Sequence, residues 1–239
     1  MKSKIVKFAL IGQLLFVSCS KDADIVKQVP ISSIILVNAV VNSNMIIADF
    51  TNSDSVAAYF SSTPPIPYGT SQEYSVPSGN VPLSIYPVAD TSHPFFKGTI
   101  VLQGQFIYSL FLAGISNSQN KPDTVKTEDH PPYHCSTDST AGLRFINLSP
   151  NSNPISVNIQ GDVNTKEVRN LVYKAFTEFK LYPANSNVIQ YAFEIRDASS
   201  DNLLITFIYP ASPFQNATIV LDGLNGGPDN SLGVFIVNY

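Results

Sequence analysis

The sequence predicts an all-β fold of two tandem immunoglobulin-like or transthyretin-like β-sandwich domains. Three observations support this: short apolar runs broken by turn residues, frequent proline, and an internal repeat. Seventeen prolines in 239 residues argue against long amphipathic helices. Runs such as Ile34–Val37 and Phe106–Leu112 have the length and composition of strands, and Pro, Gly, Asn and Ser separate them.

The first residues predict a targeting segment rather than a transmembrane helix. Three lysines lie among the first seven residues, and the apolar run Phe8–Val17 follows them. Such a run is too short to span a bilayer. A basic start and a short apolar core are typical of a secretory signal, which we assign to residues 1–18.

The end of this segment, Leu15–Cys19, resembles the lipobox of bacterial lipoproteins. The resemblance implies cleavage after Ser18 and acylation of Cys19, which becomes the first residue of the mature chain. Phe16 departs mildly from the usual Leu or Val at its position. An ordinary secretory signal with an incidental cysteine is the alternative.

Residues 19–29 read as a lipidated tether. Its start is similar to the acidic, lysine-containing export tag of Bacteroidota-type lipoproteins, with Ser20, Lys21, Asp22 and Asp24 as the tag residues. This implies an outer-membrane location facing the cell exterior; a plain solvated linker is the alternative. Removing three signal lysines from 14 basic residues leaves 11 against 18 acidic ones, a net charge of −7. Acyl chains, rather than surface charge, are therefore expected to hold the protein at the membrane.

The expected strands follow the apolar runs in chain order. In the first half, runs at Leu83–Tyr86 and Thr99–Leu102 join those already named. In the second half, Ile155–Ile159, Thr218–Leu221 and Leu232–Tyr239 have the same character. Only Lys166–Leu171 could form a short helix.

An internal repeat sets the domain count. The closest match has five identities in six positions, and two weaker matches keep the same order along the chain. The matched pairs are Thr99–Gly104 with Thr218–Gly223, Tyr68–Val76 with Tyr173–Leu181, and Val37-Asn38 with Ile146-Asn147. Copy one is predicted at 30–115, a linker at 116–140, and copy two at 141–239.

The opening of copy two, Ala141–Asn151 followed by Ile155–Ile159, resembles the first strands of the domain-of-unknown-function 4397 family. The resemblance implies extracellular bacterial β-sandwich repeats, two in tandem here. Copy one departs from the pattern, with Val40-Val41 where Ser-Pro is expected and Leu36 near the place of the arginine. The family implies no activity and no catalytic residues.

The linker contains the weak candidate metal ligands His130, His134 and Cys135, which are residue types that bind zinc. Because His134 and Cys135 are adjacent, an incidental cluster is the favoured interpretation. We predict no metal and no cofactor. Cys135 is expected to be a partly shielded free thiol, because acylation removes Cys19 as a partner.

Two loops rich in oxygen ligands, 197–202 and 222–230, could suit calcium. Their acidic residues do not follow the alternate spacing of an EF-hand loop. Turn formation is the favoured explanation, since Gly, Asn and Asp tolerate positive φ angles.

Net charge argues against nucleic-acid binding, and the absence of known motifs argues against catalysis. A surplus of acidic residues is opposite to what nucleic-acid binding requires. No nucleophile elbow, zinc-protease motif or phosphate loop occurs, and His93, in the turn Asp90–Pro94, has no recognisable nucleophile. A non-enzyme is expected. A glycosidase using a carboxylate pair stays open, with the candidates Asp49, Glu73, Glu178 and Glu194.

The expected function is partner binding in the cell envelope, with sandwich loops or edges presented to a protein or glycan. The alternatives are a glycan-capture accessory of a nutrient-uptake system and a structural stalk. Loop tyrosines are the candidate ligand contacts: Tyr59, Tyr68, Tyr86 and Tyr133. Three sites resemble a short Bacteroidota O-glycosylation motif: Ser55, Thr124 and Ser139.

Overall fold

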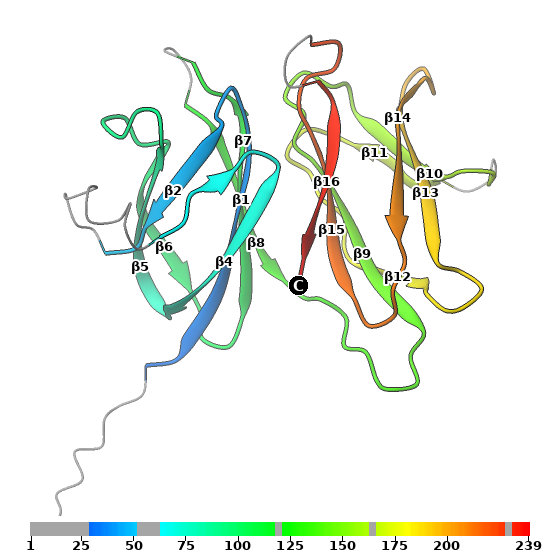
Figure 1. Cartoon of the computed structure of the whole chain (residues 1–239), viewed down its shortest axis with the longest axis horizontal. Helices are drawn as coiled ribbons and strands as arrows, with labels where there is room; N and C mark the ends of the chain where they lie inside the picture. The colour runs from blue at the N-terminus through cyan, green and yellow to red at the C-terminus, as the bar shows by residue number, and fades with distance from the viewer. Residues whose placement is uncertain (1–28, 52–62, 118–120, 163–165, 228–230) are drawn as a thin grey trace, which may run out of the picture.

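The computed structural model describes residues 29–51, 63–117, 121–162, 166–227 and 231–239 (Figure 1). Every regular element in these ranges is a β-strand, so the all-β prediction is confirmed. The strands form four four-stranded sheets, which pair into two sandwiches. Residues 166–171, the one stretch for which a helix was considered, form a strand.

Copy one contains the first eight strands. They are β1 (Ile31–Val41), β2 (Met45–Asp49), β3 (Ile66–Pro67), β4 (Thr70–Pro77), β5 (Gly79–Pro87), β6 (Phe96–Leu102), β7 (Ile107–Ile115) and β8 (Asp123–Asp129). One sheet has the order β4-β1-β7-β8 and the other β3-β2-β5-β6. Their facing side chains form one apolar core that includes Ile34, Leu83 and Leu110. Alternation along each strand sends every second residue into this core.

Copy two repeats this arrangement strand for strand. Its strands are β9 (Thr140–Asn147), β10 (Ile155–Ile159), β11 (Lys166–Leu171), β12 (Lys180–Pro183), β13 (Gln190–Asp197), β14 (Leu203–Pro210), β15 (Asn216–Asp222) and β16 (Gly233–Asn238). The sheet orders are β12-β9-β15-β16 and β11-β10-β13-β14. An immunoglobulin domain has the order ABED and CFG. The strand order therefore favours the transthyretin-like of the two predicted sandwich types.

A buried asparagine occupies the equivalent position in the first strand of each copy. Asn38 on β1 and Asn147 on β9 are both fully buried. Each side-chain amide donates to a main-chain carbonyl at 3.1 Å, that of Ile66 or of Leu171, and each side-chain oxygen accepts from the amide two residues further on. Two such buried amides would be costly without these bonds. The predicted match of Val37-Asn38 with Ile146-Asn147 is thus confirmed.

The closest sequence match of the repeat does not align equivalent strands. Thr99–Gly104 covers the end of β6, whereas Thr218–Gly223 covers most of β15. Strand β15 pairs in parallel with β9, as β7 pairs in parallel with β1, so the counterpart of β15 is β7. A run such as Thr-Ile-Val-Leu suits any buried strand, which is why it could mark non-equivalent ones.

The segment expected to be a linker contains a strand. Asp123–Asp129 forms β8, which pairs antiparallel with β7 and completes the first sandwich. Copy one therefore extends to residue 129 instead of 115, and only 130–139 connects the sandwiches. This strand was not predicted because its residues are mostly polar. Thr127 and Asp129 are nevertheless buried, which composition alone does not reveal.

The two sandwiches pack against each other through a third apolar cluster. The sheet containing β1 and β7 faces the sheet containing β9 and β15, which gives four layers side by side (Figure 1). The buried members of this cluster are Ile35, Val37, Ala39, Phe111, Ala113, Ile146, Leu148, Val220 and Val237. Because it is packed on both sides, the inner sheet of copy one has apolar residues on both faces of its central strands β1 and β7.

Candidate functional site

A concave pocket of about 880 Å³ lies at one end of copy one. Three connections contribute to it: the β1–β2 turn, the β5–β6 loop, and the β7–β8 connection through Ser116, Asn117 and Lys121. Its size is within the usual range of small-ligand sites. The lining residues are Asn42, Ser43, Asn44, Met45, Pro87, Val88, Ala89, Asp90, His93, Pro94, Phe95, Ser116, Asn117 and Lys121.

The pocket exists because a short turn and a long loop meet at this end of the sandwich. The β1–β2 turn has only three residues, 42–44, and is closed by the amide of Ser43 donating to the Val40 carbonyl at 3.1 Å. Asn42 makes this turn with a φ of 67°, a conformation that Asn adopts more readily than most residues. The β5–β6 loop has eight residues, 88–95, and stands beside the turn. Because the β1–β2 turn is short, it leaves the space beside the β5–β6 loop uncovered, and this space is the pocket.

The equivalent end of copy two is crossed by hydrogen bonds. Its first connection has seven residues, 148–154, and reaches both neighbouring turns. The Asn151 side chain donates to the Asn225 carbonyl at 3.0 Å and accepts from the Asn225 amide at 2.8 Å. The Asn153 amide donates to the Asp197 carboxylate at 2.8 Å. One fold thus has a pocket at this end of copy one, and side-chain hydrogen bonds cross the equivalent end of copy two.

An acid–imidazole pair stands at the rim of the pocket. His93 Nδ1 and Asp90 Oδ2 are 2.8 Å apart, and the Ser92 amide donates to the same carboxylate at 3.0 Å. The hydrogen bond with His93 is the main reason why the pKa of Asp90 is below its usual value. Both side chains are largely exposed. Surface pairs of this kind add little to stability.

Polar groups inside the pocket retain hydrogen-bonding capacity. The Ser43 hydroxyl is buried and has no hydrogen-bond partner in the described chain. The side chains of Asn44 and Ser116 make no hydrogen bond to any residue that the structure describes. Beside them lie the apolar side chains of Met45 and Phe95. Sequence reasoning missed this site; the available signal was the long polar loop around His93.

A second polar cluster is buried between the sandwiches. Arg144 on β9 donates through Nη2 to Asp129 Oδ1 of β8 at 2.6 Å and through Nε to Thr218 Oγ1 at 2.7 Å. Arg144 Nη2 also donates to the Tyr239 hydroxyl at 2.5 Å, and the Ser109 hydroxyl donates to Asp129 Oδ2 at 2.6 Å. The Arg144 and Asp129 side chains are 3% and 0% exposed. This cluster joins the two sandwiches, and one of its members, Tyr239, also lines a smaller pocket of about 270 Å³.

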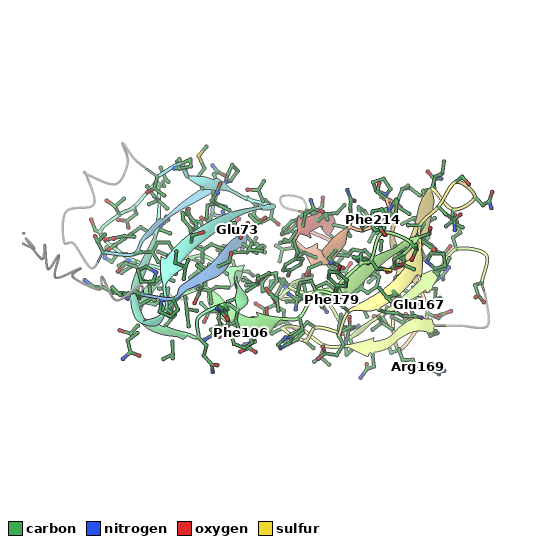
Figure 2. The ribbon with its side chains drawn as sticks, turned by 90° about the horizontal axis from the view of Figure 1, so that it is seen from below. Glu73, Phe106, Glu167, Arg169, Phe179 and Phe214 are labelled. Atoms are coloured by element: carbon green, nitrogen blue, oxygen red, sulfur yellow. The ribbon has the colours of Figure 1, made fainter. Side chains whose placement is uncertain are left out.

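Aromatic rings enclose the guanidinium on the side away from Asp129. The Arg144 Cζ atom lies 4.8 Å from the ring centre of Phe179 and 5.7 Å from that of Phe176. Figure 2 shows Phe179 at the junction of the two halves. Cation–π contacts help to compensate for the loss of water around the charge. The role of this cluster is therefore structural.

Two equivalent tyrosines reach across the junction in opposite directions. Tyr173 of copy two donates to Asp123 Oδ2 of copy one at 3.1 Å. Tyr68 of copy one lies near Asp222 of copy two, and its buried hydroxyl has no partner at hydrogen-bonding distance and angle. Burial, followed by the charge of the neighbouring carboxylate, raises the pKa of both tyrosines. The predicted equivalence of the two tyrosines is confirmed. The main-chain amide of the next residue donates to the Asn38 carbonyl in copy one and to the Asn147 carbonyl in copy two.

The predicted tyrosine ligand contacts do not converge. Tyr68 faces the second sandwich, and Tyr86 is buried in β5 with 6% exposure. Tyr133 is 90% exposed, but it lies in the connection 130–139, away from the pocket lining. Tyr59 lies outside the described residues. Tyr86 is buried and Tyr68 is half-buried at the junction, and neither lines the pocket.

The candidate metal ligands are engaged separately. His130 lies 3.3 Å from Glu128, whereas the buried His134 ring is held between Asp138 and Asn216, each at 3.0 Å. Within the described residues, no three His, Cys, Asp or Glu side chains form a group able to hold a metal ion. Cys135 was expected to be partly shielded and is exposed.

The two oxygen-rich loops are explained by turn and interface contacts. Asp197 accepts hydrogen bonds from Ser199, Ser200 and Asn153, which lower its pKa. Asp222 is buried at the junction, and burial raises its pKa. Residues 228–230 of the second loop lie outside the described part. Of the carboxylates considered for a glycosidase, Asp49 and Glu73 belong to copy one, and Glu178 and Glu194 to copy two.

The remaining sequence predictions concern the surface and the anchor. Thr124 on β8 and Ser139 in the connection are both exposed, as an O-glycosylation site requires. Ser55, the lipidation residue Cys19 and the tag residues Ser20, Lys21, Asp22 and Asp24 lie outside the described residues. The described ranges contain no helix with the length and apolar character needed to cross a membrane.

Comparison with protein-family models gives no match, and a search of curated proteins gives none either. The family resemblance at Ala141–Asn151 therefore stays a prediction. Arg144, within that segment, has a structural reason to be there, because it joins β9 to β8 of the other copy.

Proposed function

We propose that the protein is a non-catalytic lipoprotein of the cell envelope that binds a partner in the loop pocket of copy one. Acylated Cys19 anchors it to the outer membrane, with the sandwiches facing the cell exterior. The pocket is the observation that carries the proposal: it is a concave site of ligand size, at an end of copy one whose counterpart in copy two is crossed by the Asn151 and Asn153 side chains.

The position of the pocket suits a lipid-anchored binder. The tether precedes β1, and the pocket begins at Asn42, immediately after β1 ends. An 11-residue strand spans roughly 36 Å. The described chain thus begins at one end of copy one, and the pocket lies at the opposite end (Figure 1). An anchor at the first end would hold the pocket away from the membrane.

In this proposal, copy two is a rigid support for the pocket in copy one. Its inner sheet is packed against that of copy one through the third apolar cluster, and Arg144 and Asp129 pair inside the junction. A site is most effective when the elements around it do not move. A stalk remains the alternative role, and it requires no open pocket.

The proposal is tested by filling the pocket. Ala89 is an exposed lining residue, and Ala89→Trp would occupy the pocket without disturbing the core. Ser200→Trp, on the exposed equivalent turn of copy two, is the matched control. The full chain is immobilised and exposed to an outer-membrane extract that includes polysaccharide.

We expect a component to be retained by the wild type and by Ser200→Trp, but not by Ala89→Trp. Equal retention by all three proteins would place binding elsewhere on the molecule. No retention by any of them, combined with an envelope defect on shortening the connection 130–139, would favour the stalk.

A further inference from the structure

We infer that the ligand of the copy-one pocket is an uncharged saccharide. This inference rests on the proposed function, since it names the class of ligand for the same site. It is argued from three properties of the lining: its charge, its available hydrogen-bonding groups, and its apolar surface.

The lining carries little net charge. The lining contains one carboxylate, Asp90, which is hydrogen-bonded to His93 at 2.8 Å, and one ammonium group, Lys121. A phosphate-rich or polyanionic ligand would require several cations, which bind such groups by charge and by paired hydrogen bonds. The pocket instead fits a ligand without formal charge.

The hydrogen-bonding groups on offer belong to side chains. Several main-chain amides around the pocket are already used: Ser43 donates to Val40, Val88 to Met45, and Ser116 to Val41. A peptide added as an extra strand needs free main-chain groups along an edge. Groups that a ligand can reach include the half-buried Ser116 hydroxyl and the exposed Asn44 amide, which can donate and accept. Ligand hydroxyls, which also donate and accept, complement this set.

The rest of the lining is apolar and irregular in shape. Phe95 and Pro94 lie half-buried on one side, and Met45 is 45% exposed on another. A sugar ring has C–H groups that pack on such side chains while its hydroxyls reach polar ones. The thioether of Met45 is flexible and can adapt to the outline of a ring. The pocket therefore combines both requirements of saccharide recognition.

The test uses an array of immobilised neutral and acidic oligosaccharides, probed with the purified full chain. Neutral glycans should be bound by the wild type and by Ser200→Trp, and Ala89→Trp should lose detectable binding. Asn44→Leu removes hydrogen bonds at nearly constant volume and should weaken affinity about three- to tenfold. Asn187→Leu, on an exposed turn of copy two, is the matched amide control and should leave affinity unchanged.

Four outcomes separate this inference from the proposed function. Pocket-dependent binding of neutral glycans supports both. Binding of acidic glycans alone, abolished by Lys121→Met, overturns the uncharged class. Pocket-dependent retention of an envelope component without any glycan binding overturns the saccharide inference and leaves the proposed function standing. Absence of both kinds of binding overturns both, provided that thermal unfolding shows each variant to be folded.

Discussion

Arg144 and Asp129 form a buried ion pair between two sandwiches that the chain builds from separate halves. The guanidinium comes from the first strand of copy two and the carboxylate from the last strand of copy one, and their closest atoms are 2.6 Å apart. Neither side chain has appreciable contact with solvent. The last strand of copy one thus supplies a main contact of the junction.

Removing one partner of this pair should strongly destabilise the protein. Arg144→Leu leaves the Asp129 carboxylate buried without its cation, which typically costs about 3–5 kcal/mol. Urea unfolding should show a clearly lower midpoint, and the double variant Arg144→Leu/Asp129→Leu should recover part of the loss. Arg169→Leu is the control, since Arg169 is exposed and points away from the body (Figure 2). An unchanged midpoint for Arg144→Leu would contradict the buried pairing.

The two equivalent tyrosines should respond differently to the same substitution. Tyr173→Phe removes the hydrogen bond to Asp123 and should cost about 1–2 kcal/mol. Tyr68→Phe removes a buried hydroxyl without a hydrogen-bond partner, so the stability should be unchanged or slightly higher. Urea midpoints of the two variants provide the comparison. Equal losses would show that Tyr68 is hydrogen-bonded to Asp222 in solution.

Asp222 should make the protein less stable as pH rises. Burial raises its pKa in the folded state above the unfolded value of about 3.9. The stability linked to protonated Asp222 is therefore complete below pH 3.9 and is lost as pH rises through the folded pKa. Asp222→Asn cannot ionise, so its stability relative to the wild type should increase over that range. Urea unfolding from pH 3.5 to pH 8 measures the trend, and a constant difference would contradict it.

Asp197 should show the opposite dependence. Hydrogen bonds from Ser199, Asn153 and Ser200 lower its pKa below the unfolded value of about 3.9. Its contribution is present above that pH and is lost as pH falls through the folded pKa. The advantage of the wild type over Asp197→Asn should therefore shrink on acidification below pH 4. Circular dichroism during acid titration measures this, and an advantage that grew with acid would refute it.

The anchor is tested by protease shaving of intact cells. The wild type should be digested, because the proposal places both sandwiches outside the cell. A variant lacking residues 21–24 should be protected, since the export tag is missing, and Cys19→Ala should leave the membrane fraction. Protection of a lipidated wild type would place the protein on the periplasmic side and remove external ligands from consideration.

Local sequence patterns predicted part of the fold correctly. Proline content and apolar alternation predicted strands throughout, and the pairs Val37-Asn38 and Ile146-Asn147 located the first strand of each copy. They succeeded because alternation is a local property and because a buried asparagine needs the same hydrogen bonds in both copies. The run Thr99–Gly104 misled, since a general strand sequence carries no information about its sheet.

The sequence by itself determined the strand content and the duplication, and it predicts a lipoprotein signal at the N-terminus. Tertiary structure decided the rest. It placed β8 in copy one, buried Tyr86 and the Tyr68 hydroxyl, and joined Arg144 to Asp129. The pocket depends on how far a three-residue turn and an eight-residue loop reach when two strands bring them together. Such distances arise from packing between segments far apart in the chain, and no local pattern encodes them.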